Sequence, residues 1–347
     1  MMWNPDIYRD TDYGLEDDDT FEPVDDIEDD FVPAEGEPYI QTVLGPIRLE
    51  EAGVALIHEH LQWDPAGDPQ ADTDNRINDL HATLLDLEAF FSASGRTIVS
   101  ATPAVAGRRA DGLLWLARHA PVHIVAVTGF HTQRYLESWY GVNAADAMRA
   151  DIERDLNEGM DGTEARPGLI KVGTSEGIIT DLERHSIELA AEAHRKHHLP
   201  VITHAEHGSM ALEQVQLLSD LGVDASRVVV SHLDFIEDER QLRAIADSGV
   251  FMSFDQLGKP YRGPDQPKAR RIASLVRDGY RDQILISHDF ARRSLLTGYS
   301  GRPGLSYIVE QFAIMLLEEG LEALDVRAIL VDNTARAMAV MPPGSVV

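Results

Sequence analysis

The chain contains no cysteine among its 347 residues. Disulfide bonds, iron–sulfur clusters and thiolate zinc sites are therefore excluded, and any bound metal must have nitrogen and oxygen ligands. Basic residues are also scarce, because 30 Lys and Arg stand against 59 Asp and Glu, for a net charge of −29. Such an excess of negative charge argues against a nucleic-acid-binding surface and against an anionic membrane partner.

No apolar run approaches the length of a membrane span, and the acidic N-terminus is unlike the basic start of a signal peptide, so we expect a cytoplasmic protein. Between Met1 and Ile40 stand fifteen acidic residues and one basic residue, Arg9. This segment contains Pro and Gly and shows no helical or strand period. We therefore predict a disordered acidic arm over residues 1–39, with a solubilising role as its simplest interpretation.

From residue 40 to residue 347, short apolar runs alternate with longer amphipathic ones. The short runs are continuous and rich in Val, Ile and Leu, as in parallel strands covered on both faces; they lie at 54–60, 97–102, 123–130, 168–175, 200–206, 227–234, 250–256 and 283–290. Thr180 and Glu183 form a capping box at the start of one intervening helix, which ends before Pro200.

Eight strand–helix units without a break predict an α/β protein of the (β/α)8 TIM-barrel class, with residues 40–347 as one domain. A doubly wound open sheet is the alternative fold. It has less support, because no GxGxxG or Walker loop follows the first strand.

Polar side chains gather at the ends of the predicted strands. The first strand ends in HEH, so that His58 and His60 point to the same face and can bind one cation together. Four later strands carry a polar residue within or late in the run: Lys171, His204, His232 and Asp289. A barrel gathers the carboxyl ends of its strands around one mouth, so we expect all six side chains to converge there.

Each of these six residues also has a simpler interpretation. A lone histidine in a strand is more often a hydrogen-bonded core residue than a metal ligand. A lysine or an aspartate inside an apolar run is harder to explain, because burying either charge is costly unless it is paired or chemically altered. Two divalent cations would account for the whole set, which predicts a two-metal hydrolase. Of the other histidines, we interpret His288 as structural and expect His131 and His207 beside the pocket.

These residues resemble the binuclear site of the phosphotriesterase family of the amidohydrolase superfamily, over the text from TVLGPI (42–47) to about residue 339. The resemblance implies that one buried metal is held by His58, His60 and Asp289, that a more exposed one is held by His204 and His232, and that Lys171, carboxylated on its side-chain amine, bridges the two. Nitrogen and oxygen ligands suit Zn²⁺, and also Mn²⁺, Co²⁺ or Fe²⁺. The resemblance further suggests a homodimer.

Two further segments, FDQLGK (254–259) and the text from 289 to 308, are similar to the phosphorylated sugar lactonases and the phosphotriesterase-homology proteins of this family. In that branch a lysine, an arginine and a tyrosine receive the substrate phosphate, which implies these roles for Lys259, Arg292 and Tyr299. The protein as a whole is acidic, so basic side chains beside the predicted metal site would form a local binding site for an anion. The alternative is that these cations only offset nearby carboxylates.

We therefore expect a metal-dependent hydrolase that uses a bridging hydroxide to open a lactone, with Asp289 carrying the proton to the leaving oxygen. The expected substrate is an anionic lactone, specifically that of a phosphorylated sugar. An acyl-homoserine lactonase or an aryldialkylphosphatase-like phosphotriesterase with the same site is the first alternative. The second is an inactive barrel scaffold whose acidic arm binds a partner.

Overall fold

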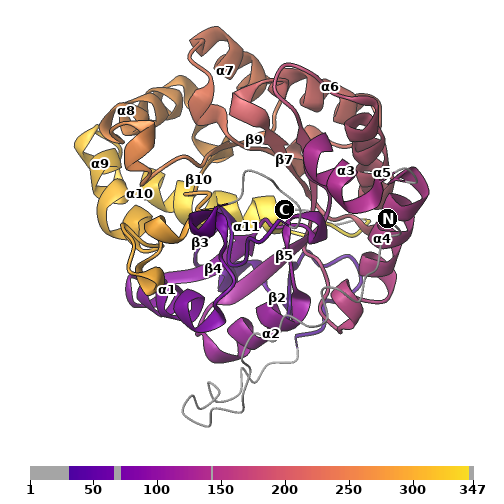
Figure 1. The fold of residues 1–347 in the computed structure, drawn as a ribbon. Coiled ribbons are helices and arrows are strands. Elements are labelled where there is room, and N and C mark those ends of the chain that lie inside the picture. The colour runs from indigo at the N-terminus through magenta and orange to yellow at the C-terminus, as the bar shows by residue number, and fades with distance from the viewer. Residues whose placement is uncertain (1–30, 66–71, 142–143, 344–347) are drawn as a thin grey trace.

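A computed structural model describes residues 31–65, 72–141 and 144–343 of the chain. Each of the eight apolar runs forms a strand, and the strands pair in parallel in chain order within one eight-stranded sheet. Their bounds are β3 Val54–Glu59, β4 Gly95–Ser100, β5 His123–Gly129, β6 Leu169–Thr174, β7 Val201–Ala205, β8 Val228–Val230, β9 Phe251–Phe254 and β10 Ile284–Ile286. The helices surround this sheet (Figure 1), which confirms the predicted (β/α)8 barrel.

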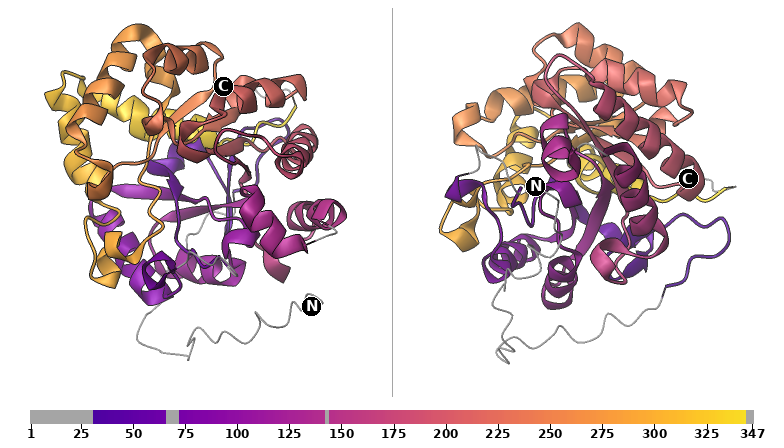
Figure 2. Two further views of the ribbon diagram at one scale, coloured as in Figure 1. Left: turned by 45° about the horizontal axis from the view of Figure 1, so that its top comes forward. Right: turned by 45° about the vertical axis from the view of Figure 1, so that its right-hand side comes forward.

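The helices form an outer layer around the strands, as two further views show (Figure 2). Its helices are α1 Leu80–Ser92, α2 Ala110–His119, α3 Gln133–Tyr140, α4 Ala144–Asn157, α5 Asp181–His197, α6 Ala211–Asp220, α7 Glu239–Asp247, α8 Gln266–Leu275, α9 Ala313–Glu318, α10 Ala323–Arg327 and α11 Asn333–Met338. The predicted capping box is present at α5: Thr180 Oγ1 accepts from the Glu183 amide at 3.3 Å, and Glu183 Oε2 accepts from the Thr180 amide at 3.0 Å. None of the helices in the described ranges combines the length and apolar character that crossing a membrane requires.

The interior of the barrel is an apolar core to which every strand contributes. It contains Ala55, Ile57, Val99, Val125, Val127, Leu169, Ile202, Val229, Phe251 and Leu285. The same cluster includes Ile40 and Ile47, from the antiparallel hairpin β1 Ile40–Thr42 and β2 Gly45–Ile47, and Met338 of α11. The hairpin and α11 therefore close the amino-terminal end of the barrel, which leaves the carboxyl ends of the strands for polar side chains.

The first and last strands meet at a seam built from the HEH segment. The Asp289 amide donates to the His58 carbonyl at 2.9 Å, and the Ser287 hydroxyl lies 2.9 Å from both the amide and the carbonyl of His58. The carboxylate of Glu59 is fully buried and accepts from the Ser287 hydroxyl at 2.7 Å, and from the His288 amide and Nδ1 at 2.7 and 2.9 Å. Glu59 thus joins strands that lie 229 residues apart in the sequence.

The acidic arm stays a prediction, because residues 1–30 lie outside the described ranges. At its predicted end, Tyr39 forms an isolated β-bridge with Val340.

Candidate metal centre

All six residues predicted at the strand ends meet at the mouth of the barrel. Three short contacts connect them: Lys171 Nζ lies 2.9 Å from His58 Nε2, His60 Nε2 lies 3.0 Å from Asp289 Oδ1, and His232 Nε2 lies 2.7 Å from His204 Nδ1. His58, His60, Lys171 and His232 are buried, whereas the side chains of His204 and Asp289 keep some exposure, at 15% and 18%.

The two imidazoles of the first strand reach this centre through an irregularity. The inward-facing residues of β3 are Ala55 and Ile57, so strict alternation would turn His58 outward. The pairing register between β3 and β4 shifts between Leu56 and Glu59, and such a bulge re-aims the side chains that follow it. His58 therefore faces the mouth despite following an inward-facing residue.

A single buried carboxylate, that of Asp255 just after β9, orients two of the histidines. Its Oδ2 accepts from His58 Nδ1 at 2.9 Å, and its Oδ1 accepts from His232 Nδ1 at 2.7 Å. A carboxylate is an acceptor only, so the ring hydrogens of both imidazoles lie on Nδ1. The Nε2 lone pairs of His58 and His232 are then directed into the centre.

The other two histidines are oriented by different partners. The Thr102 hydroxyl donates to the Gln62 carbonyl at 2.6 Å, so it accepts from His60 Nδ1 at 2.7 Å and leaves the His60 Nε2 lone pair toward Asp289. Glu206 Oε2 accepts from His204 Nε2 at 2.8 Å, which leaves the His204 Nδ1 lone pair toward His232. All four imidazoles thus have one nitrogen fixed from outside and present the other to the centre, as metal-ligating histidines do.

The protonation of these groups follows from their burial. Burial, followed by the positive charge of Lys171, lowers the pKa of His58 to about 3. Burial also lowers the pKa of His60, and burial together with His232 lowers the pKa of His204 to about 4. Burial opposes a charge on His232 as well, but Asp255 outweighs it and raises the pKa of this residue. At neutral pH, His58, His60 and His204 are therefore neutral and have a lone pair to donate.

Lys171 and Asp289 complete the centre. Burial lowers the pKa of Lys171 to about 8, against the opposing attraction of Asp289 and Asp255. Burial disfavours the charge of Asp289, but Lys259 and His60 overcome it and hold the pKa of this carboxyl well below its usual range. Asp289 has a backbone φ of 53°, a left-handed value that is uncommon outside glycine and typical of functional positions.

The residues present fit divalent cations. One ligand atom each from His58, His60 and Asp289 lies within 4.8 Å of the others, as a single metal ion requires. The lone pair of His60 faces a carboxylate oxygen at 3.0 Å and that of His204 faces an imidazole nitrogen at 2.7 Å, so a cation or a proton must separate each pair. His58, His232 and Asp255 form a second group of this size, in which Asp255 contacts the outer nitrogens of both rings.

The predicted substrate residues lie in different surroundings. Lys259 is buried, and its Nζ donates to Asp289 Oδ2 at 2.8 Å and to Gln256 Oε1 at 2.9 Å. Arg292 pairs with Asp74 at 3.3 Å and keeps 40% of its side chain exposed. Tyr299 is bonded to the start of α1, because its hydroxyl accepts from the amide of the N-cap residue Asp79 at 2.8 Å and donates to the Asp79 carbonyl at 3.0 Å.

The segment that carries Arg292 and Tyr299, residues 289–307, is fixed by two aspartates, Asp74 from the segment before α1 and Asp86 from α1 itself. Asp74 accepts from the Ser294 amide at 2.7 Å and from its hydroxyl at 2.8 Å. The buried carboxylate of Asp86 in α1 accepts from the Thr297 amide at 3.0 Å, from its hydroxyl at 2.8 Å, and from the next amide at 2.8 Å. This 289–307 loop is therefore held in one position relative to the mouth.

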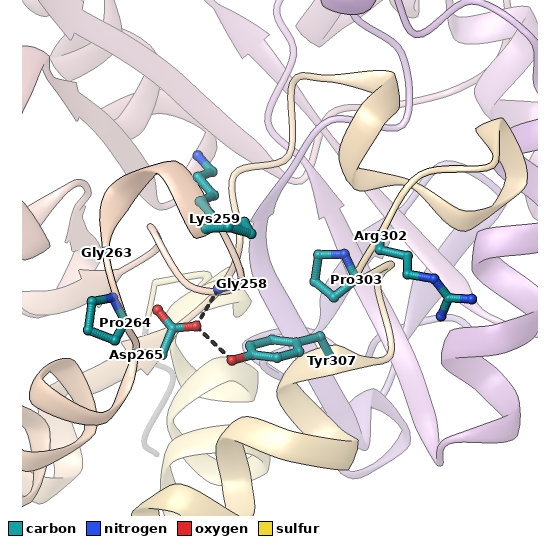
Figure 3. Close-up of a pocket in the computed structure, with 9 residues that line it drawn as sticks. Gly258, Lys259, Gly263, Pro264, Asp265, Arg302, Pro303 and Tyr307 are labelled. Carbon is teal, nitrogen blue, oxygen red and sulfur yellow. Dashed lines mark hydrogen bonds between the residues drawn. The ribbon is translucent and has the colours of Figure 1, made fainter.

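A cavity of about 260 Å³ lies beside Lys259, between the loop after β9 and the end of the 289–307 loop. Figure 3 shows that the Lys259 side chain extends away from Asp265, on the far side of the Gly258 backbone. Asp265 accepts from the Gly258 amide at 2.7 Å and from the Tyr307 hydroxyl at 2.8 Å. Lys259 therefore lines this cavity, but its ammonium bonds to Asp289 and Gln256.

Sequence reasoning missed the residues that orient the ligands. Asp255 shows the signal that identified Asp289, a carboxylate at the end of an apolar strand, and alternation from the inward-facing Phe251 places it inside. Thr102 and Glu206 carry no comparable signal. Of the two histidines expected beside the pocket, His131 is buried with its ring centroid 4.4 Å from that of His204, whereas His207 pairs with Glu176 at 3.3 Å.

Comparison with known proteins places the chain among hydrolases. The sequence profile of the phosphotriesterase family matches residues 38–338. The phosphotriesterase homology protein of Escherichia coli is 30% identical over 289 residues, covering 83% of this chain and 98% of the relative. An N-acetyltaurine hydrolase of Tetraodon nigroviridis is 30% identical over 343 residues, covering 85% and 96%. A phospho-furanose lactonase of Mycoplasmopsis synoviae is 27% identical over 323 residues, covering 87% and 92%.

Among solved structures, a lactonase from Listeria monocytogenes superposes with a TM-score of 0.82 at 29% identity, covering 87% of this chain and 99% of the lactonase. The match of the family profile to nearly the whole barrel, and the near-complete coverage of these relatives, show that the chain belongs to the phosphotriesterase family of hydrolases.

Proposed function

We propose that the protein is a binuclear-metal-dependent lactonase whose substrate is a phosphorylated sugar lactone. His58, His60 and Asp289 would hold one divalent cation, His204 and His232 the other, and Lys171, carboxylated on Nζ, would bridge them. The observation that carries this proposal is the common orientation of the four imidazoles, each fixed from outside with its free nitrogen toward another of the six predicted residues. Lactonases among the relatives support the reaction class.

The buried lysine supports the bridging role. A carboxylated lysine forms when the neutral amine attacks carbon dioxide, and a pKa of about 8 gives Lys171 far more neutral amine at pH 7 than a solvated lysine has. The amine lies 2.9 Å from a histidine nitrogen and is fully buried. Carboxylation converts this buried cation into an anion with two oxygen ligands, which suits the cations proposed beside it.

When bound, divalent cations supply a Lewis acid for the carbonyl oxygen and lower the pKa of a nearby water molecule. In this proposal Asp289 moves the proton. As the water oxygen adds to the lactone carbon, Asp289 takes a proton, and it returns this proton to the ring oxygen when the carbon–oxygen bond breaks. The product is a hydroxy acid. Lys259 and Gln256, which both donate to Asp289 Oδ2 at 2.8 Å, hold the carboxylate in position.

The test is a pH-indicator screen of the zinc- or manganese-loaded protein against sugar lactones, their phosphorylated forms, acyl-homoserine lactones and phosphotriesters. We expect the phosphorylated lactone to have the highest kcat/KM. Asp289→Asn should abolish this turnover while the fold is retained, as judged by its thermal melt. Turnover of a phosphotriester or an acyl-homoserine lactone, with no opening of any sugar lactone, would overturn the proposal in favour of those activities.

A second candidate function follows from the relatives that hydrolyse N-acetyltaurine. The same ligand set could activate water toward an amide whose far end is a sulfonate. Including N-acetyltaurine in the screen, with taurine release as the readout, decides between the amide and the lactone.

A further inference from the structure

Two arginines lie close to the ring of one exposed tyrosine, Tyr261, in the loops at the mouth of the barrel. The guanidinium carbon of Arg292 lies 5.8 Å from the Tyr261 ring centroid, and that of Arg262 lies 5.7 Å from the same ring. Arg292 comes from the loop after β10, whereas Tyr261 and Arg262 come from the loop after β9. Tyr261 is 56% exposed, so this group, which we call the rim arginine pair, is open to solvent.

The rim arginine pair is connected to the proposed ligands through a single ring. Arg262 lies over Phe235, with its guanidinium carbon 4.8 Å from the ring centroid. The Phe235 ring in turn lies 6.5 Å from that of His232. On the other side, Arg292 follows Asp289 by three residues. A small substrate with its reacting carbonyl at the metal centre would therefore bring its far end toward these guanidinium groups.

The two arginines differ in their charge partners. Arg292 is partly neutralised by Asp74, at 3.3 Å. Within the described ranges, Arg262 makes no ion pair and no side-chain hydrogen bond, and its ring contacts leave its donors free. An unpaired guanidinium is unexpected where Asp and Glu outnumber Lys and Arg 59 to 30, since nearby carboxylates are abundant. A guanidinium fork matches the oxygens of a tetrahedral anion and can bind two of them at once.

We propose that Arg262 determines specificity for the anionic substrate: together with Arg292 and the edge of Tyr261, it binds the phosphate group. The inference rests on the proposed function for the position of the reacting end and for the presence of the phosphate. It assigns the main recognition role to Arg262, which the sequence did not single out. Lys259, by contrast, is committed to Asp289. A sulfonate has the same tetrahedral oxygens with less charge, so it is the rival source of this chemistry.

The test is isothermal titration of the zinc-loaded full-length protein with ribose 5-phosphate, ribose and N-acetyltaurine. We compare the wild type with Arg262→Gln, Arg262→Lys and Lys196→Gln. Lys196 is an exposed cation at the carboxyl end of α5, at the opposite end of the barrel, so Lys196→Gln removes the same charge far from the mouth. Arg262 is exposed, and unchanged thermal melts will show that the fold is intact.

We expect Arg262→Gln to raise the Kd for ribose 5-phosphate about tenfold or more, since one charge-assisted hydrogen bond is lost. Arg262→Lys should retain part of the affinity for ribose 5-phosphate. Lys196→Gln should bind ribose 5-phosphate as the wild type does, and the affinity for ribose should be the same in all variants. Equal Kd values for ribose 5-phosphate in the wild type and Arg262→Gln would overturn the inference. A tenfold loss for N-acetyltaurine with none for ribose 5-phosphate would overturn the phosphate assignment in favour of a sulfonate.

The kinetic arm separates this inference from the proposed function. With a phosphorylated lactone, Arg262→Gln should raise KM and leave kcat nearly unchanged, while turnover of the neutral lactone is unaffected. If no variant opens any lactone, the proposed function fails, but the titration still decides the role of Arg262. If the lactones are opened and KM does not respond to Arg262→Gln, the inference fails and the proposed function stands.

Discussion

Replacing Asp255 by Asn tests the orientation of the ligands. The two carboxylate oxygens of Asp255 each accept from a different imidazole, His232 at Oδ1 and His58 at Oδ2. An asparagine of nearly the same size offers one acceptor oxygen and one NH₂ group. One Nδ1–H then faces a second donor, and that histidine must change its tautomer or rotate, which directs its hydrogen toward the metal centre.

The magnitude follows from what one such partner contributes. Loss of an outer partner of a ligating histidine typically costs about 10- to 100-fold in metal affinity, and one lost hydrogen bond to a buried charge costs about 1.5–3 kcal/mol, which is a similar factor. We therefore expect Asp255→Asn to weaken binding of at least one Zn²⁺ by about 10- to 100-fold. The assay is competition for zinc against a chelator of known affinity, with the metal content measured after dialysis.

A matched control separates metal affinity from stability. Asp161 forms two hydrogen bonds to the buried Arg108, at 2.8 and 3.1 Å, and contacts none of the four histidines. Asp161→Asn should lower the free energy of unfolding but leave the zinc affinity unchanged. Wild-type zinc affinity in a folded Asp255→Asn protein would refute the reasoning, because the imidazoles would then owe their orientation to something else.

Three further predictions concern the metal-free protein and the barrel itself. The pKa values of His58 and His204 are lowered to about 3 and about 4, so below pH 6.5 the folded protein binds fewer protons than the unfolded chain. The free energy of unfolding should therefore fall by a few kcal/mol as the pH falls below about 6.5, at about 1.4 kcal/mol per pKa unit, although the raised pKa of His232 opposes this loss. Equal urea midpoints at pH 7 and pH 5 would contradict this prediction. Gly129→Ala should cost about 2 kcal/mol or more in urea unfolding, because φ is 99° there and an added Cβ would lie 2.2 Å from a carbonyl oxygen of β6; a change below about 0.5 kcal/mol would show that the strand yields easily. Asp86→Ala should destabilise the fold by about 2–3 kcal/mol, because three hydrogen-bond donors of the 289–307 loop lose their acceptor. The same change should raise KM for the anionic substrate. An unchanged KM would mean that this loop does not position the substrate.

The strands were predictable because a parallel strand inside a barrel is covered on both faces and reads as an unbroken apolar run. All eight runs form strands, and the six polar residues within them meet at the mouth. Alternation gives the correct inward direction for Lys171 and His204. It does not give that of His58, where a shift in register intervenes.

The rest depends on contacts that sequence spacing does not determine. The hydroxyl of Tyr299 bonds to the backbone of a residue 220 positions away, and the guanidinium of Arg292 pairs with Asp74 in the segment between β3 and α1. Loop side chains have no period from which a direction follows, so a resemblance can suggest their roles but not their partners. The same holds for the outer partners of His60 and His204, because Thr102 lies 42 positions from His60 and Glu206 lies in the turn that follows His204.

The seam between the first and last strands has a consequence for when the proposed metal site can form. His58 and His60 emerge early in synthesis and Asp289 late, and Glu59 joins them only when the last strand docks. A chain in which β10 has not yet docked therefore has an open ring and an incomplete set of the proposed ligands. The proposed site is completed only when the barrel closes, so metal would bind the closed barrel and would not guide its assembly.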